Sequence, residues 1–141
     1  MLYFVNKLPK RLGVLEDLDA MVLFAHEYLN LPKELELEIN FDYSLPKQRA
    51  GEADYFDGVA SIVLNGRVAK RDFAATVFHE MVHIKQMLHN ELTLDNGQAR
   101  WKGKAYIGYY YSLPWEEEAF RLEQDMMKIF EDKKNELHRN R

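Results

Sequence analysis

The chain has 141 residues, 47% hydrophobic and 30% charged, which is enough for a domain with its own core. Its net charge of −4 argues against nucleic acid as a partner, and the absence of cysteine excludes disulfides and cysteine-ligated metals. Because no signal-like start or run of about 20 apolar residues is present, a cytoplasmic protein without membrane contact is expected.

The first half of the chain predicts one helix and two strands. Apolar residues at helical spacing indicate a helix over residues 12–29. Alternating apolar and acidic residues over 35–43 indicate a strand with one solvated face. A loop is expected over 46–52, followed by a second strand over 55–64 and a turn at Asn65-Gly66.

The second half predicts two helices around an aromatic segment. Helical periodicity runs from residue 70 to 89, and the aromatic residues and glycines of 100–111 suggest a hairpin or irregular strand. Pro114 is suited to open a final helix that continues to about Leu137. With no repeat or linker, residues 1–141 are predicted to form a single α+β domain.

Two histidines four residues apart, His79 and His83, form an HExxH pattern within the second expected helix. One helical turn separates them, so both imidazoles can point at one Zn²⁺ ion. Glu80 lies between them in sequence as a carboxylate able to act as a general base. The alternative is a pair of hydrogen-bonded or exposed histidines, but apolar neighbours place this helix against a core, where unpaired polar groups are costly. The pattern therefore favours a metal site.

A zinc site of this kind needs a third protein ligand, and His89 is the first residue to consider. A third histidine at this spacing requires a glycine that breaks the helix, and Gln86 stands at that position. Gln86, Met87 and Leu88 favour a continuous helix, which would carry His89 past the metal. His89 is therefore predicted to be a surface residue near the end of the helix.

The acidic cluster at the start of the last helix offers three other candidates. Glu116 suits the capping of free amides after Pro114, and Glu117 falls on a polar face. Glu118 shares a stripe with apolar residues, where a carboxylate needs a partner. We therefore expect Glu118 to be the third ligand and keep Glu116 as the alternative. The stripe comprises Trp115, Ala119, Leu122, Met126 and Ile129.

These motifs together resemble the gluzincin branch of zinc metallopeptidases, with a size similar to minigluzincin and SprT-like proteins. HExxH at 79–83, W-x-G at 101–103 and P-W-E-x-E-A at 114–119 look like the pattern of small metallopeptidases found in phages and bacteria. The resemblance covers the second half of the chain. It departs from true SprT proteins, which use a third histidine, and from ImmA-type peptidases, which continue with a leucine-rich ending.

The resemblance implies a zincin-like fold, in which a small mixed sheet packs on the HExxH helix between N-terminal and C-terminal helices. Its edge strand, placed by position at 55–64, would pair with an extended peptide or protein substrate. Zn²⁺ held by His79, His83 and Glu118 would polarise the scissile carbonyl, and Glu80 would carry the proton. Candidates for oxyanion stabilisation are Tyr106, Tyr109, Tyr110, Tyr111 and His89.

Two alternatives remain open at this point. The same fold could act as a non-catalytic module that binds a peptide at its edge strand, although Glu80 has no use in a structural site. Action near DNA has support only from Lys133, Lys134 and the basic residues 139–141, which a solvated helix end explains equally well. Trp101 and Trp115 are expected to be packing residues, and the oligomeric state is left open.

Overall fold

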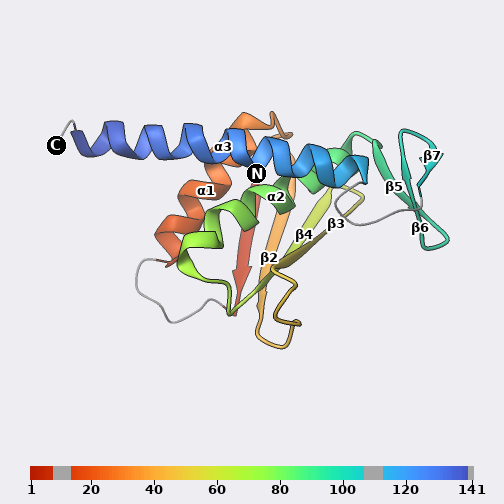
Figure 1. The fold of residues 1–141 in the computed structure, drawn as a ribbon, viewed down its shortest axis with the longest axis horizontal. Helices are drawn as coiled ribbons and strands as arrows, with labels where there is room; N and C mark the ends of the chain where they lie inside the picture. The colour runs from red at the N-terminus through yellow and green to blue at the C-terminus, as the bar shows by residue number, and fades with distance from the viewer. Residues whose placement is uncertain (8–13, 107–112, 140–141) are drawn as a thin grey trace.

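A computed structural model describes residues 1–7, 14–106 and 113–139 (Figure 1). In the described chain, runs of consecutive strands lie between helices, so the expected α+β class is confirmed. The elements are β1 (Leu2–Asn6), α1 (Val14–Tyr28), β2 (Glu36–Asp42), β3 (Gly51–Phe56), β4 (Val59–Asn65), α2 (Lys70–Leu88), β5 (Leu92–Asp95), β6 (Gln98–Trp101), β7 (Lys104–Ala105) and α3 (Pro114–Arg139).

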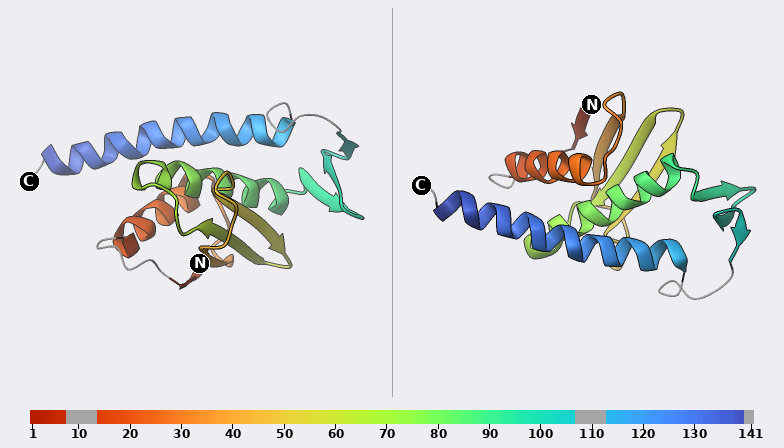
Figure 2. Two further views of the ribbon diagram at one scale, coloured as in Figure 1. Left: turned by 60° about the horizontal axis from the view of Figure 1, so that its bottom comes forward. Right: turned by 90° about the horizontal axis from the view of Figure 1, so that it is seen from above.

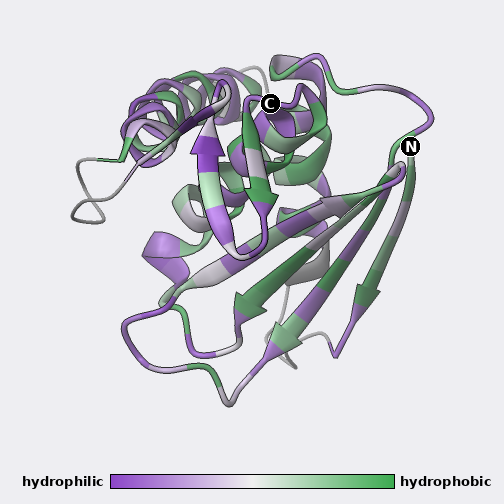
Figure 3. Cartoon of the chain, turned by 90° about the vertical axis from the view of Figure 1, so that its right-hand side faces the viewer, coloured by the Kyte–Doolittle hydropathy of each residue, from purple (hydrophilic) through white to green (hydrophobic). Residues whose placement is uncertain are grey.

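The larger sheet has four strands in the order β1-β2-β4-β3. β1 and β4 run parallel to β2, and β3 runs antiparallel to β4, so the sheet is mixed as expected. On β2, Leu37, Ile39 and Phe41 are buried in the core, while Glu36 and Glu38 lie on the opposite face. Figure 3 shows this alternation of hydrophobic and hydrophilic residues along the strands.

The strand expected over residues 55–64 is a hairpin, and this corrects the position of the edge. It contains the end of β3, a turn at Asp57-Gly58 and most of β4. Asp57 and Gly58 have φ of 49° and 85°, the left-handed conformations that a tight hairpin turn requires. β4 therefore lies inside the sheet, and β3 forms the edge, beginning at Gly51 within the segment expected to be a loop.

The three helices form two further layers over one face of the sheet. α1 and α2 pack on the sheet, and α3 lies across them on the side away from the strands (Figure 2). α2 is therefore enclosed by the sheet on one side and by α3 on the other. This position accounts for a helix that buries both apolar and polar residues around most of its surface.

An aromatic cluster fixes one half of α3 against the other helices. Phe130 of α3 packs on Phe78 of α2 and on Phe24 of α1, with ring centroids 5.3 and 5.4 Å apart. Met126, one helical turn earlier, is fully buried in the same core. These contacts align α2 and α3 and so determine which residues meet farther along their interface.

A second, three-stranded sheet of β5, β6 and β7 follows α2 and projects at one end of the molecule (Figure 1). β6 and β7 form a hairpin that overlaps the hairpin or irregular strand suggested for 100–111, of which residues 107–111 lie outside the described residues. β5 was not predicted. Within the described ranges, no helix is both long and apolar enough to span a membrane.

Candidate metal centre

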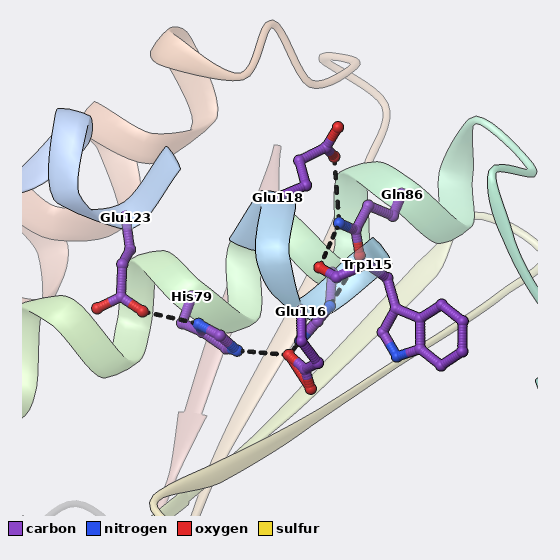
Figure 4. A network of polar contacts seen from close by, with 7 residues as sticks. His79, Gln86, Trp115, Glu116, Glu118 and Glu123 are labelled. Atoms are coloured by element: carbon purple, nitrogen blue, oxygen red, sulfur yellow. Dashed lines mark hydrogen bonds and ion pairs between the residues drawn. The ribbon is translucent and has the colours of Figure 1, made fainter. Parts of the chain in front are cut away.

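His79, His83 and Glu116 meet in the interface between α2 and the start of α3. The Nε2 atoms of the two histidines each lie 2.9 Å from the same Glu116 Oε1 atom. Three candidate ligand atoms, one from each residue, lie within 4.8 Å of one another, and all three side chains are buried. Figure 4 shows His79 and Glu116 pointing toward each other across the two helices. Three such donors could hold a metal ion.

The second nitrogen of each imidazole has its own partner, and this orients the first. His79 Nδ1 lies 2.8 Å from Glu123 Oε1, and His83 Nδ1 lies 2.8 Å from Gln86 Oε1. When Nδ1 donates a hydrogen to such an acceptor, the lone pair of a neutral imidazole is on Nε2. Both Nε2 atoms then face the Glu116 carboxylate, the arrangement that metal-ligating histidines use.

Glu118, the expected third ligand, does not reach the histidines. Its Oε1 accepts a hydrogen bond from Gln86 Nε2 at 3.1 Å (Figure 4). It accepts another from Lys85 Nζ at 3.2 Å. Burial raises the pKa of Glu118, but these hydrogen bonds outweigh it and hold the pKa below its usual value. The geometry therefore places the alternative, Glu116, and not Glu118, beside His79 and His83.

The difference between the expected residue, Glu118, and the observed residue, Glu116, comes from the rotation of α3 about its axis. Residues two apart on a helix point about 200° away from each other, so only one of Glu116 and Glu118 can point at His79 and His83. Glu118 instead reaches Gln86 and Lys85 of α2. The apolar stripe used for the prediction includes Ile129, which is 37% exposed. The observed stripe keeps Trp115, Ala119 and Met126 but continues to Phe130 in place of Ile129, which brings Glu116 into the interface.

The centre holds strongly coupled charges. Burial lowers the pKa of His79, but its hydrogen bonds to Glu116 and Glu123 outweigh this and raise the pKa to about 9. Burial also lowers the pKa of His83, but its hydrogen bonds to Glu116 and Gln86 and the nearby charges of Glu80 and Glu116 together outweigh burial and raise the pKa. Burial raises the pKa of Glu116, but the two histidines lower it to about 2. The carboxylate therefore prefers a positively charged neighbour.

Glu80, the predicted general base, is buried beside the two histidines. Burial raises its pKa, and the histidines offset part of this effect. It packs closely against the edge strand: a Cβ added at Gly51 would lie 3.2 Å from Glu80 Cγ and 3.3 Å from Glu80 Oε2. The absence of a side chain at Gly51 therefore gives Glu80 its room next to β3.

A cleft of about 900 Å³ brings these groups to the surface. Residues 48–53, which lead into and form the start of β3, make one wall, and α2 and α3 make the other. Asn65 holds the first wall in place, because its Nδ2 donates to the carbonyl oxygens of Pro46 and Arg49. The residues that carry the chemistry are His79, Glu80, His83, Glu116 and Glu123, and all five line the cleft.

The other predicted residues lie elsewhere. His89 follows the last residue of α2 with a half-exposed side chain, as expected. Trp115 is buried and packs edge-on against Tyr106 with centroids 6.3 Å apart, which agrees with a packing role. Neither Tyr106 nor His89 belongs to the described lining of the cleft. Three oxyanion candidates lie outside the described residues, namely Tyr109, Tyr110 and Tyr111.

Glu123 and Gln86 contact the two histidines but were not predicted as site residues. Both lie at helical spacing from a predicted residue: Gln86 is three residues after His83, and Glu123 is seven after Glu116. These spacings place each pair on one face of a helix. A search for polar residues that continue the face of the histidines could have found them.

Comparisons of the chain with protein-family models, with curated protein sequences and with solved structures give no match.

Proposed function

We propose that the protein is a zinc-dependent peptidase of the zincin type. The observation that carries the proposal is the convergence of His79, His83 and Glu116 in one open cleft with the carboxylate of Glu80. Two imidazoles and one carboxylate are a donor set of catalytic zinc sites, in which a fourth position stays open. The raised pKa of Glu80 supports a role in proton transfer at neutral pH.

Zinc, when bound, supplies a Lewis acid that makes water nucleophilic near neutral pH and polarises a carbonyl. His79, His83 and Glu116 would hold it. Glu80 would accept a proton from the attacking water and deliver it to the amine that leaves. In the described chain β3 has β4 as its one strand partner, so its other edge offers backbone groups along the cleft to an extended peptide.

The test combines metal content with cleavage. Purified protein should bind close to one zinc per chain and cleave an unfolded protein substrate, measured by elemental analysis and by peptide mass spectrometry. Glu80→Gln should retain the metal and lose about 100- to 10,000-fold of the cleavage rate, because the amide keeps the shape of the side chain without its basicity.

Glu131→Gln serves as a matched control, because it makes the same change at an exposed glutamate of α3 outside the cleft lining. It should leave both zinc content and cleavage unchanged. Zinc binding without cleavage across a broad peptide library would instead favour a non-catalytic peptide-binding module, and absence of bound zinc would reject the proposal.

A further inference from the structure

Gln86 and Glu118 form a chain of hydrogen bonds behind His83. Gln86 Oε1 lies 2.8 Å from His83 Nδ1. Gln86 Nε2 donates to the carbonyl oxygen of Trp115 at 2.9 Å and to Glu118 Oε1 at 3.1 Å (Figure 4). Gln86 is 0% exposed, so water does not compete for these partners. The donor and acceptor groups of Gln86 are therefore paired within the protein, and its orientation is set by those partners.

The partners of Gln86 fix the direction of its amide. A glutamine side chain presents an oxygen acceptor at one side and an NH₂ donor at the other. The Trp115 carbonyl and the Glu118 carboxylate are both acceptors, so the NH₂ group must face them. The reversed amide would place three acceptor oxygens together in a buried site and remove the donor that Gln86 supplies to Trp115 and Glu118, which is costly.

This direction in turn decides where the proton of His83 lies. With Gln86 Oε1 facing it, Nδ1 must carry the hydrogen and donate. Nε2 of the neutral ring then carries the lone pair, on the side of Glu116 and the other candidate ligand. We propose that Gln86, oriented by Glu118 and Trp115, is a positioning residue that selects the metal-binding tautomer of His83. This inference rests on the proposed metal function.

The two histidines differ in how this selection is made. Glu123 behind His79 is a carboxylate, which accepts through either oxygen and needs no orientation. Gln86 behind His83 could face either way, and so needs a partner to fix it. Glu118 provides this and is itself held by Lys85, whose Nζ also lies 3.1 Å from Glu91 Oε1. Glu118 thus acts on the metal centre without touching it.

A first experiment reads the tautomer without any metal. In a Glu116→Ala background, which removes the acceptor shared by both Nε2 atoms, long-range ¹H–¹⁵N spectra at a pH where the rings are neutral distinguish the two tautomers. His83 should be in the Nδ1–H form. Adding Gln86→Met, which keeps the size of the side chain, should produce a mixture at His83 and leave His79 unchanged. An unchanged His83, or an equal change at both rings, would overturn the proposal.

A second experiment measures zinc affinity in the otherwise native chain by competition with a chelator. Gln86→Met should weaken binding about 10- to 100-fold, the usual effect of losing a partner behind a metal-ligating histidine. Glu118→Leu should weaken it by less than about tenfold. Glu118→Gln should restore affinity, because its amide oxygen can still accept from Gln86. Glu117→Gln, an exposed neighbour, is the control and should have no effect.

The two measurements separate this inference from the proposed function. If the native chain binds no zinc, the proposed function fails, and the tautomer of His83 still decides the role of Gln86. If zinc binds and Gln86→Met has native affinity, the positioning role fails while the metal centre stands. Should Gln86→Met not fold, as judged by circular dichroism, the difference in zinc affinity between Glu118→Leu and Glu118→Gln decides the positioning role instead.

Discussion

The interface between α2 and α3 has two halves of opposite chemistry. In one half Phe78 and Phe130 pack with Phe24 of α1, and in the other His79 faces Glu116 and Glu123. The apolar half needs only volume and shape, so the chain satisfies it alone. The polar half needs a specific partner for each atom, and its buried imidazoles and carboxylates must share protons or an ion. Adjacent residues of one helix, Phe78 and His79, therefore impose different requirements.

The largest effect is expected in the apolar half. Phe130→Ala should lower the free energy of unfolding by about 3–5 kcal/mol, because it leaves a cavity among aromatic rings. Ile129→Ala, a truncation at an exposed neighbouring position, is the control and should cost much less. Zinc affinity of folded Phe130→Ala should stay within about twofold of the native value, because Ala119 and Met126 still fix the rotation of α3 when one ring is removed. Chemical denaturation measures the free energy of unfolding, and chelator competition measures the zinc affinity. A loss of zinc affinity in parallel with the loss of stability would show that the two halves of the interface are coupled.

The next effect belongs to the polar half and tests its assignment. Glu116→Ala should weaken zinc binding by more than about 100-fold, beyond the range typical of partners behind the ligands. Glu118→Ala should weaken it by less than about tenfold, because Glu118 contacts Gln86 and Lys85 rather than the histidines. Competition titration with a chelator compares the two. A larger loss of zinc affinity with Glu118→Ala than with Glu116→Ala would identify Glu118, the residue favoured by the sequence, as the third ligand.

Glu123→Ala should have an intermediate effect. It removes the acceptor of His79 Nδ1 and should weaken zinc binding by about 10- to 100-fold. Glu123→Gln retains an oxygen that can accept, so it should recover most of the loss. Gln124→Ala, one residue farther on the exposed side of α3, is the matched control. Equal affinities for Glu123→Ala and the control would show that His79 needs no partner.

The smallest expected effect is the pH dependence of the metal-free protein. The pKa of folded His79 is raised to about 9 from 6.5, so its hydrogen bonds stabilise the fold fully below about pH 6.5 and lose this effect as pH rises through 9. Thermal unfolding in the presence of a chelator should therefore show a melting temperature that falls by roughly a few degrees between pH 6.5 and 9.5. A flat or rising profile would contradict the charged pairing. His79→Gln should remove most of the slope.

The contrast between the halves also explains what the sequence could predict. The bounds of α1, α2 and α3 follow from apolar periodicity, and HExxH brings His79 and His83 together by helical geometry alone. The third carboxylate depends on the rotation of α3, which is set by contacts such as Phe130 on Phe78 that lie far apart in the sequence. The stripe of the sequence analysis fits either rotation nearly as well, so periodicity did not decide between Glu116 and Glu118.

The edge strand was missed for a different reason, since its signal was present in the sequence. Asp57-Gly58 is a hairpin turn pair, and residues on either side of it alternate in burial. The prediction of a single strand over 55–64 overlooked the Asp57-Gly58 turn. It therefore placed β4, an interior strand, at the edge of the sheet. Gly51, by contrast, owes its position to the close approach of Glu80, a tertiary contact that no local pattern reveals.

The carboxylate behind His79 also sets the valence of the ion that this buried centre can accept. Glu116 and Glu123 bring two negative charges to a pair of imidazoles that are neutral once metal is bound. Glu80 lies outside the group of three candidate ligands and is not counted in this sum. A divalent cation then gives a net charge of zero, whereas monovalent and trivalent ions leave an uncompensated charge of one unit away from water. Charge balance, independent of donor type, therefore selects for doubly charged ions.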